Sequence, residues 1–150
     1  MESVIFEEHQ EIVLRGPLAF LSGAAFFVIP LFTTMPLALI LLMFVLGIGM
    51  TYLMNSFMQM HTLVTPTELW FGPKIWTRRV PVGQTEVVGP QEIPFMAGVG
   101  IHHFRGKTYY NMRMGKGLAV KHGSKLYVIG SAKIPEFQMA LEGAAREVNR

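Results

Sequence analysis

The stretch MPLALILLMFVLGIGMTYLM, residues 35–54, contains twenty uncharged residues and is the strongest structural signal in the chain. An α-helix rises about 1.5 Å per residue, so a helix of this length matches a hydrocarbon core roughly 30 Å thick. No Asp, Glu, Lys or Arg occurs between Arg15 and Glu68, which is atypical of a soluble core. The stretch therefore predicts a transmembrane helix.

A second apolar segment, PLAFLSGAAFFVIPLF at residues 17–32, lies just before it. This segment is about 24 Å long as a helix, and Ile12–Leu14 would extend it to full span if Arg15 reached back to the interface. The acidic residues before it are opposite to what a cleaved secretion signal needs. We therefore expect residues 1–58 to form an N-terminal segment and a two-helix transmembrane hairpin that turns at residues 33–35.

Flanking charges predict the orientation of this hairpin. The turn lacks Lys and Arg, whereas Arg15 precedes the first segment and basic residues follow the second. Positively charged flanks favour the cytoplasmic side. We expect a multi-pass protein of the cell membrane with both termini in the cytoplasm.

Small residues four positions apart occur in both apolar segments, as Ala19 with Gly23 and as Gly47 with Thr51. Such pairs let helix backbones approach one another closely. We expect them to mark helix contacts.

Charge is distributed unevenly along the chain. Residues 1–15 hold four Glu against Arg15, a balance of −3, whereas residues 55–150 hold twelve Lys or Arg against six acids, a balance of +6. A basic surface near a bilayer attracts anionic headgroups, and it also keeps a domain soluble. The chain has no cysteine, which excludes disulfides, thiolate metal sites and thiol catalysis.

From about Gln59 the pattern changes to short segments rich in Val, Ile, Tyr, Phe and Trp, separated by Gly and Pro. This punctuation is typical of a β domain. The candidate strands are His61–Thr65, Glu68–Phe71, Ile75–Val80, Gln84–Gly89, Thr108–Met112, Gly117–Lys121 and Leu126–Gly130. Seven short strands predict a sandwich or open barrel over residues 59–150.

The C-terminal segment has a different period. After Pro135, apolar residues recur at helical spacing, namely Phe137, Leu141, Ala144, Ala145 and Val148. They predict an amphipathic helix whose apolar side packs on the β domain.

Several motifs occur in a familiar order between about residues 61 and 146. They are VTPTELWFG at 64–72, RVP at 79–81, GVGI at 98–101, YYN at 109–111 and IGS at 129–131. Together they resemble small bacterial membrane proteins, mostly uncharacterised, in which a transmembrane hairpin precedes a pleckstrin-homology-like (PH-like) domain. The resemblance implies an α+β membrane protein with a PH-like seven-stranded β sandwich or open barrel capped by a C-terminal helix.

Two segments depart from that family pattern. Residues 97–100 lack the extra Gly and the aromatic residue that the family often places there. Residues 131–134 replace a shorter cap that usually offers an acidic side chain to the helix N-terminus. The first departure weakens any ligand role for that loop.

Motifs that would signal catalysis or metal binding are missing from the sequence. His61, His102, His103 and His122 are of the residue type that most often binds metals, but adjacent histidines of a strand point to opposite faces, and no HExxH spacing occurs. Gly98, Gly100 and Gly106 fit no phosphate-binding loop, and no GxSxG elbow surrounds Ser131. We therefore predict no catalytic residue, no cofactor and no metal site, and hence no enzyme.

The basic residues of the β domain are the main candidates for function. Those singled out as contacts for anionic lipid or a partner are Lys74, Arg78, Arg79, Arg105 and Lys107. Each well-placed basic residue gains on the order of 1 kcal/mol from anionic lipid. The sequence thus predicts a non-catalytic, membrane-anchored interaction or scaffold module that contacts the bilayer, anionic headgroups and a protein partner, but no nucleic acid. The alternative is an accessory subunit whose hairpin packs within a transporter or membrane-enzyme complex.

Overall fold

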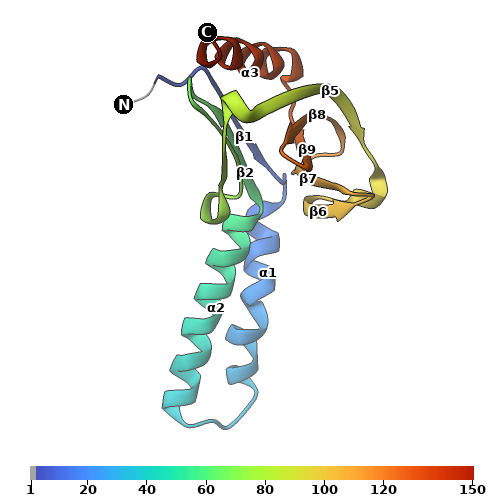
Figure 1. Ribbon diagram of the computed structural model, residues 1–150. Coiled ribbons are helices and arrows are strands. Elements are labelled where there is room, and N and C mark those ends of the chain that lie inside the picture. Colours follow the sequence, from blue (N-terminus) through green and yellow to red (C-terminus); the bar gives the residue numbers. More distant parts are fainter. Residues whose placement is uncertain (1–2) are drawn as a thin grey trace. The chain divides into compact units, whose positions relative to one another are not determined.

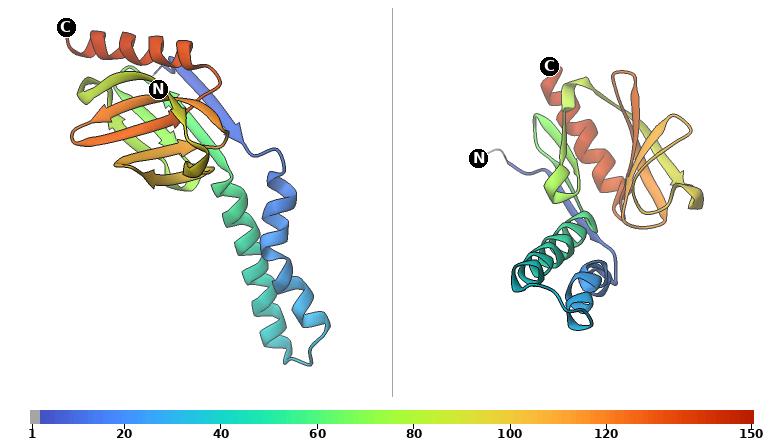
Figure 2. Two further views of the ribbon diagram at one scale, coloured as in Figure 1. Left: turned by 90° about the vertical axis from the view of Figure 1, so that its right-hand side faces the viewer. Right: turned by 90° about the horizontal axis from the view of Figure 1, so that it is seen from below.

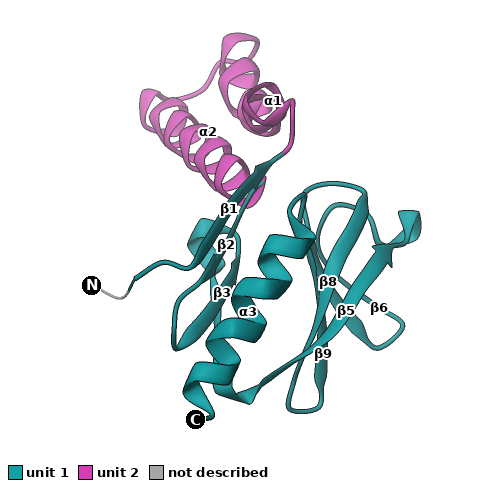
Figure 3. Cartoon of the chain, turned by 90° about the horizontal axis from the view of Figure 1, so that it is seen from above, with its two compact units in different colours: residues 1–11, 59–150 teal, residues 12–58 magenta. Residues whose placement is uncertain are grey.

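The computed structural model describes residues 3–150 and divides the chain into two compact units (Figure 3). Met1 and Glu2, which belong to the predicted N-terminal segment, lie outside the described residues. Unit 1 comprises the residues up to Glu11 together with residues 59–150, and unit 2 comprises residues 12–58. Unit 2 is therefore inserted into the sequence of unit 1.

Unit 2 consists of two helices and a short connection. Helix α1 spans Arg15–Val28, the 3-10 helix η1 spans Ile29–Leu31, and helix α2 spans Leu37–Phe57. The small residues predicted to mark contacts do so, because a Cβ atom added to Gly23 would lie 2.6 Å from the carbonyl oxygen of Gly47. Glycine at both positions lets α1 and α2 pack closely.

The predicted two-helix transmembrane hairpin at residues 1–58 is wrong. Within residues 3–150, only α2 is long and apolar enough to cross a membrane, with 21 residues that reach about 31 Å. Helix α1 has 14 residues and reaches about 21 Å, because residues 12–14 do not extend it and η1, which contains Pro30, follows it. A strand, β1 (Phe6–Glu11), also precedes α1 and belongs to unit 1.

Unit 1 contains two β-sheets and one helix (Figures 1 and 2). The first sheet has the order β1-β2-β3-β4 and the second has the order β5-β8-β9-β7-β6. Strands β7 and β9 pair in parallel, whereas the other neighbours are antiparallel. The strands other than β1 are β2 (Gln59–Val64), β3 (Glu68–Gly72), β4 (Arg78–Pro81), β5 (Thr85–Ile93), β6 (Gly100–Phe104), β7 (Lys107–Asn111), β8 (Gly115–His122) and β9 (Lys125–Gly130).

The predicted seven-stranded sandwich or open barrel is therefore also wrong, since the described residues form sheets of four and five strands. Strands β1 and β6 are the additional ones. The predicted strand Ile75–Val80 is shortened, because Lys74–Trp76 forms a 3-10 helix and β4 begins only at Arg78. The predicted C-terminal helix is present as α3 (Ile134–Val148).

Helix α3 contacts strands of both sheets, and Figure 3 shows it lying alongside them. Its residues Phe137, Leu141 and Ala144 are buried, as the apolar spacing predicts, whereas Val148 is 49% exposed. The ring of Phe137 stacks on that of Phe6 in β1, with centroids 5.1 Å apart. The N-terminal strand and the C-terminal helix thus share one core.

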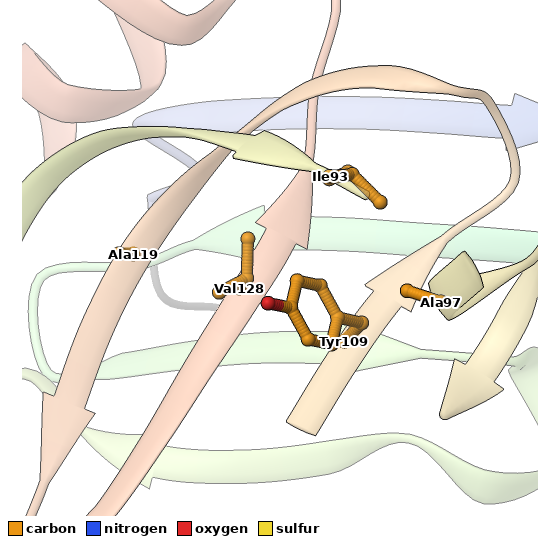
Figure 4. Packing of buried hydrophobic residues seen from close by; sticks show 5 residues of the cluster. All are labelled: Ile93, Ala97, Tyr109, Ala119 and Val128. Carbon is orange, nitrogen blue, oxygen red and sulfur yellow. The ribbon is translucent and has the colours of Figure 1, made fainter. Parts of the chain in front are cut away.

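A second apolar cluster lies on the face of the five-stranded sheet opposite to that from which Tyr127 projects (Figure 4). Tyr109, Val128 and Ala119 lie in one register row across β7, β9 and β8, and Ile93 and Ala97 complete the cluster. Since neighbouring residues of a strand point to opposite faces, Tyr127 and Thr108 project from the other side of the sheet.

Candidate functional site

A polar cleft of about 460 Å³ opens in unit 1 beside Tyr127. It collects residues from strands β4, β6, β7 and β9 and from the turns that join β6 to β7 and β8 to β9. The lining residues are Arg78, His103, Gly106, Thr108, Tyr110, Ser124, Lys125, Leu126 and Tyr127. The lining contains no Asp or Glu.

Strand register aligns three of these side chains in a row. His103 of β6 pairs with Thr108 of β7, and Thr108 pairs in turn with Tyr127 of β9. Directly paired residues project from the same face of a sheet. Thr108 Oγ1 lies 3.3 Å from His103 Nδ1, so the row is joined by a contact as well as by register.

Arg78 reaches the cleft from the other sheet. Its guanidinium carbon lies 4.9 Å from the centre of the Tyr127 ring, which is a favourable cation–π position. Phe71 of β3 packs edge-on against Tyr110, with centroids 4.8 Å apart, and against Tyr127 at 5.3 Å. The aromatic packing holds the Tyr127 ring rigidly beneath the arginine.

Two buried donors that belong to residues lining this cleft have no partner among residues 3–150. They are the hydroxyl of Tyr127, a residue only 1% exposed, and the Nε–H group of Arg78. No carboxylate of the described chain lies within ion-pair distance of Arg78. Buried donors without acceptors are costly, so their presence at a cleft favours a ligand that accepts hydrogen bonds.

Electrostatics in the cleft follow from the same residues. Burial raises the pKa of Tyr127 above its ordinary value, and the positive charge of Arg78 offsets part of this rise. Arginine and lysine carry donors but no acceptor. With Arg78 and Lys125 on its lining and no acid among the lining residues, the cleft is suited to an anionic group such as a phosphate.

Of the five basic residues predicted as contacts, Arg78 alone lines the cleft. Arg79, its neighbour in β4, is exposed and lies 3.8 Å from the centre of the Trp70 ring. Arg105 and Lys107 flank the lining residue Gly106, and Arg105 has a positive φ of 51° at the β6–β7 turn. Lys74 is exposed in the 3-10 helix η2 (Lys74–Trp76).

Sequence reasoning did not assign Thr108, Ser124 or Tyr127 to a site. The signal that connects Thr108 and Tyr127 is the parallel pairing of β7 with β9, in which the two residues are direct partners. This pairing joins strands that are not consecutive in the chain, so no local sequence motif predicts it.

The four candidate metal-binding histidines do not come together. His102 Nε2 contacts the carbonyl oxygen of Val99, and His122 Nδ1 contacts that of Gln84. His103 lines the cleft, whereas His61 lies in β2 beside residues of β1. Ser131, the residue considered as a nucleophile, lies just before α3 and donates a hydrogen bond from its hydroxyl to Glu8 of β1.

No family model, curated protein or solved structure matches this chain. The resemblance to membrane proteins with PH-like domains therefore stays a prediction from the sequence.

Proposed function

We propose that the protein is a membrane-anchored, non-catalytic interaction module, held at the bilayer through α2, whose cleft beside Tyr127 binds the phosphate of an anionic lipid headgroup. The observation that carries the proposal is the pair of unpartnered donors, Tyr127 hydroxyl and Arg78 Nε–H, at one cleft lined by no acid.

The membrane part of the proposal is supported by the surface of α2. This helix has no charged residue, and only Gly47 and Ser56 are buried along it. Large apolar side chains such as Leu37 and Val45 are 70% and 66% exposed. A helix that is apolar all round requires an apolar environment, and burial of its surface is favourable by roughly 25 cal/mol per Å².

The ligand part is supported by the chemistry of the lining. A phosphate offers several acceptor oxygens and negative charge, which match the hydroxyl of Tyr127 and the cations Arg78 and Lys125. We propose a lipid rather than a free anion because an anchored chain stays at the membrane, where headgroups are concentrated. The cytoplasmic location of both termini stays a prediction from the flanking charges.

The test is calorimetric titration of the full chain in neutral detergent. The three probes are short-chain phosphatidic acid, phosphatidylcholine of the same chain length, and inorganic phosphate. We expect phosphatidic acid to bind at least about tenfold more tightly than phosphatidylcholine, since charge-assisted hydrogen bonds contribute about 1.5–3 kcal/mol each. Inorganic phosphate binding as tightly as the lipid would instead identify a free anion as the ligand.

Arg78→Gln and Arg79→Gln form a matched pair for this test. Both remove one positive charge from adjacent positions of β4, but only Arg78 lines the cleft. We expect Arg78→Gln to weaken phosphatidic acid binding about tenfold and Arg79→Gln to change it little. An equal loss from the two variants, or no binding by the parent chain, would refute a headgroup site.

A further inference from the structure

Three side chains outside the cleft converge on the exposed face of the first sheet. Glu7 Oε1 lies 3.0 Å from His9 Nε2 and 3.0 Å from His61 Nε2. The two imidazole rings are stacked, with centroids 4.2 Å apart and planes 5° from parallel. The candidate ligand atoms of the three residues all lie within 4.8 Å of one another.

Strand pairing produces this cluster. His9 of β1 and His61 of β2 are direct antiparallel partners, so their side chains project from the same face of the sheet. Glu7 lies two residues before His9 and shares that face by alternation. The intervening Glu8 is buried on the other face, as the alternating burial of β1 shows.

The donor set and its dimensions suit a transition-metal ion. Zinc binds imidazole nitrogen at about 2.0–2.1 Å and carboxylate oxygen at about 2.0–2.2 Å. Two such ligands at a tetrahedral angle are then about 3.3 Å apart. The observed separations of 3.0 Å between Glu7 Oε1 and each histidine nitrogen are within a few tenths of that value.

Direct hydrogen bonding is the competing explanation for the cluster. It explains why each histidine contacts Glu7, and these hydrogen bonds, that from His9 first, lower the pKa of the carboxyl. One carboxylate oxygen can accept two hydrogen bonds, and the direct pairing of His9 with His61 already brings the two rings together, so hydrogen bonding fits both features. A shared ion fits the donor set as well; it must lie in the plane of each imidazole, so the stacked rings would turn toward each other to bind it.

We propose that Glu7, His9 and His61 form a binding site for a divalent transition-metal ion, with zinc as the ion of choice. Two imidazoles and one carboxylate suit Zn²⁺ better than the oxygen-preferring Mg²⁺ or Ca²⁺. The side chains of His9 and Glu7 are 71% and 47% exposed, which leaves the remaining coordination position open to water or to a further ligand. The ion would join β1 directly to β2.

The experiment measures zinc binding to the full, untagged chain in neutral detergent by competition with a chromogenic chelator. We expect one Zn²⁺ per chain. Separate replacements His9→Gln, His61→Gln and Glu7→Gln should each weaken binding at least about tenfold, since even loss of a residue that only supports a ligand costs 10–100-fold. His122→Gln, which removes a histidine outside the cluster, should leave the affinity unchanged.

Thermal unfolding provides the second readout. Zinc should raise the melting temperature of the parent chain, because an ion that binds only the folded state stabilises it. The rise should vanish in His9→Gln. Because the His9 side chain is exposed, this replacement should not disturb folding. Undiminished affinity in this variant, an equal loss in His122→Gln, or no binding by the parent chain would overturn the site.

Discussion

Ser131 Oγ donates a hydrogen bond of 2.6 Å to Glu8 Oε2, joining the N-terminal strand to the segment that leads into α3. The backbone N–H of Ala132 donates to the other carboxylate oxygen of Glu8 at 2.9 Å, and that of Lys133 donates to Ser131 Oγ at 2.9 Å. Residues 131–134 contain no acidic side chain. Strand β1 supplies the carboxylate that this entry to the helix would otherwise lack.

Removal of this carboxylate should destabilise unit 1. Glu8 is only 8% exposed, and Glu8→Ala leaves the Ser131 hydroxyl and the Ala132 N–H without their acceptor. We expect the free energy of unfolding to fall by about 1–3 kcal/mol. Urea unfolding followed by tryptophan fluorescence reports on unit 1 alone, because both tryptophans, Trp70 and Trp76, belong to it.

The matched control for Glu8→Ala is Glu7→Ala in metal-free buffer. Glu7 faces away from the core, and exposed charge pairs contribute at most about 1 kcal/mol. Equal destabilisation by the two replacements would contradict the role of Glu8 at the start of α3.

Docking of α3 can be tested at its centre. Leu141 is fully buried, so Leu141→Asp places an unpaired charge in the core at a cost of several kcal/mol, comparable with the stability of a small domain. We expect unit 1 to unfold and to become sensitive to proteases. Met139→Asp, two positions earlier and 65% exposed, should retain the protease resistance of the parent chain.

Tyr127 should make unit 1 less stable in alkali. Burial raises the pKa of the Tyr127 hydroxyl in the folded state above its ordinary value of 10.0. The associated stability is therefore complete below pH 10 and is lost as the pH rises through the folded-state pKa. Tyr127→Phe should reduce the loss of urea resistance between pH 9 and pH 11, and an unchanged pH profile would contradict it.

At neutral pH the same replacement should change stability little, because the Tyr127 hydroxyl has no hydrogen-bond partner within residues 3–150. Tyr127→Phe should nevertheless weaken phosphatidic acid binding, since it removes a donor from the cleft. A stability loss of several kcal/mol near pH 7 would show that the hydroxyl has a structural partner.

Unit 1 should fold without unit 2. Glu11 and Gln59 are direct partners at the ends of β1 and β2, so residues 12–58 can be replaced by Asn-Gly to join the strands as a two-residue hairpin. We expect a soluble protein with cooperative unfolding. A chain that simply begins at residue 59 lacks β1, Phe6 and Glu8, and we expect it to be much less stable; equal stability of the two would contradict a structural role for β1.

The sequence predicts the helical elements best. The twenty-residue apolar stretch becomes α2, and the spacing of Phe137, Leu141 and Ala144 identifies the buried side of α3. Both signals come from runs of residues close in sequence. The sequence predicts too long a first helix, because residues 12–14 and 29–32 are apolar but lie outside α1.

The two unpredicted strands lack the usual apolar alternation. In β1, the inward positions are Phe6, Glu8 and Gln10, of which only the first is apolar. The two polar side chains are accommodated by hydrogen bonds to Ser131, Ala132 and Gly130, which are distant in sequence. Strand β6 is joined to β7 by Arg105-Gly106, both with positive φ, whereas the common sequence signals for such a turn are Asn-Gly and Asp-Gly.

The candidate sites depend on the same long-range pairing. Composition alone pointed to Arg78, but the cleft also needs Tyr127, which reaches Arg78 only when the two sheets pack together. Likewise, His61 acquires Glu7 and His9 as neighbours only through the pairing of β1 with β2. Neither relationship can be predicted from the spacing of residues that are close in sequence.

The insertion of unit 2 between paired strands also fixes an order of events during synthesis. Strand β1 leaves the ribosome before β2 and cannot pair with it until all of residues 12–58 have followed, so it is without its partner during that interval. Apolar strands with free edges pair readily with other chains, and charged side chains discourage this. We expect the three glutamates of β1, Glu7, Glu8 and Glu11, to discourage such pairing until β2 has been made.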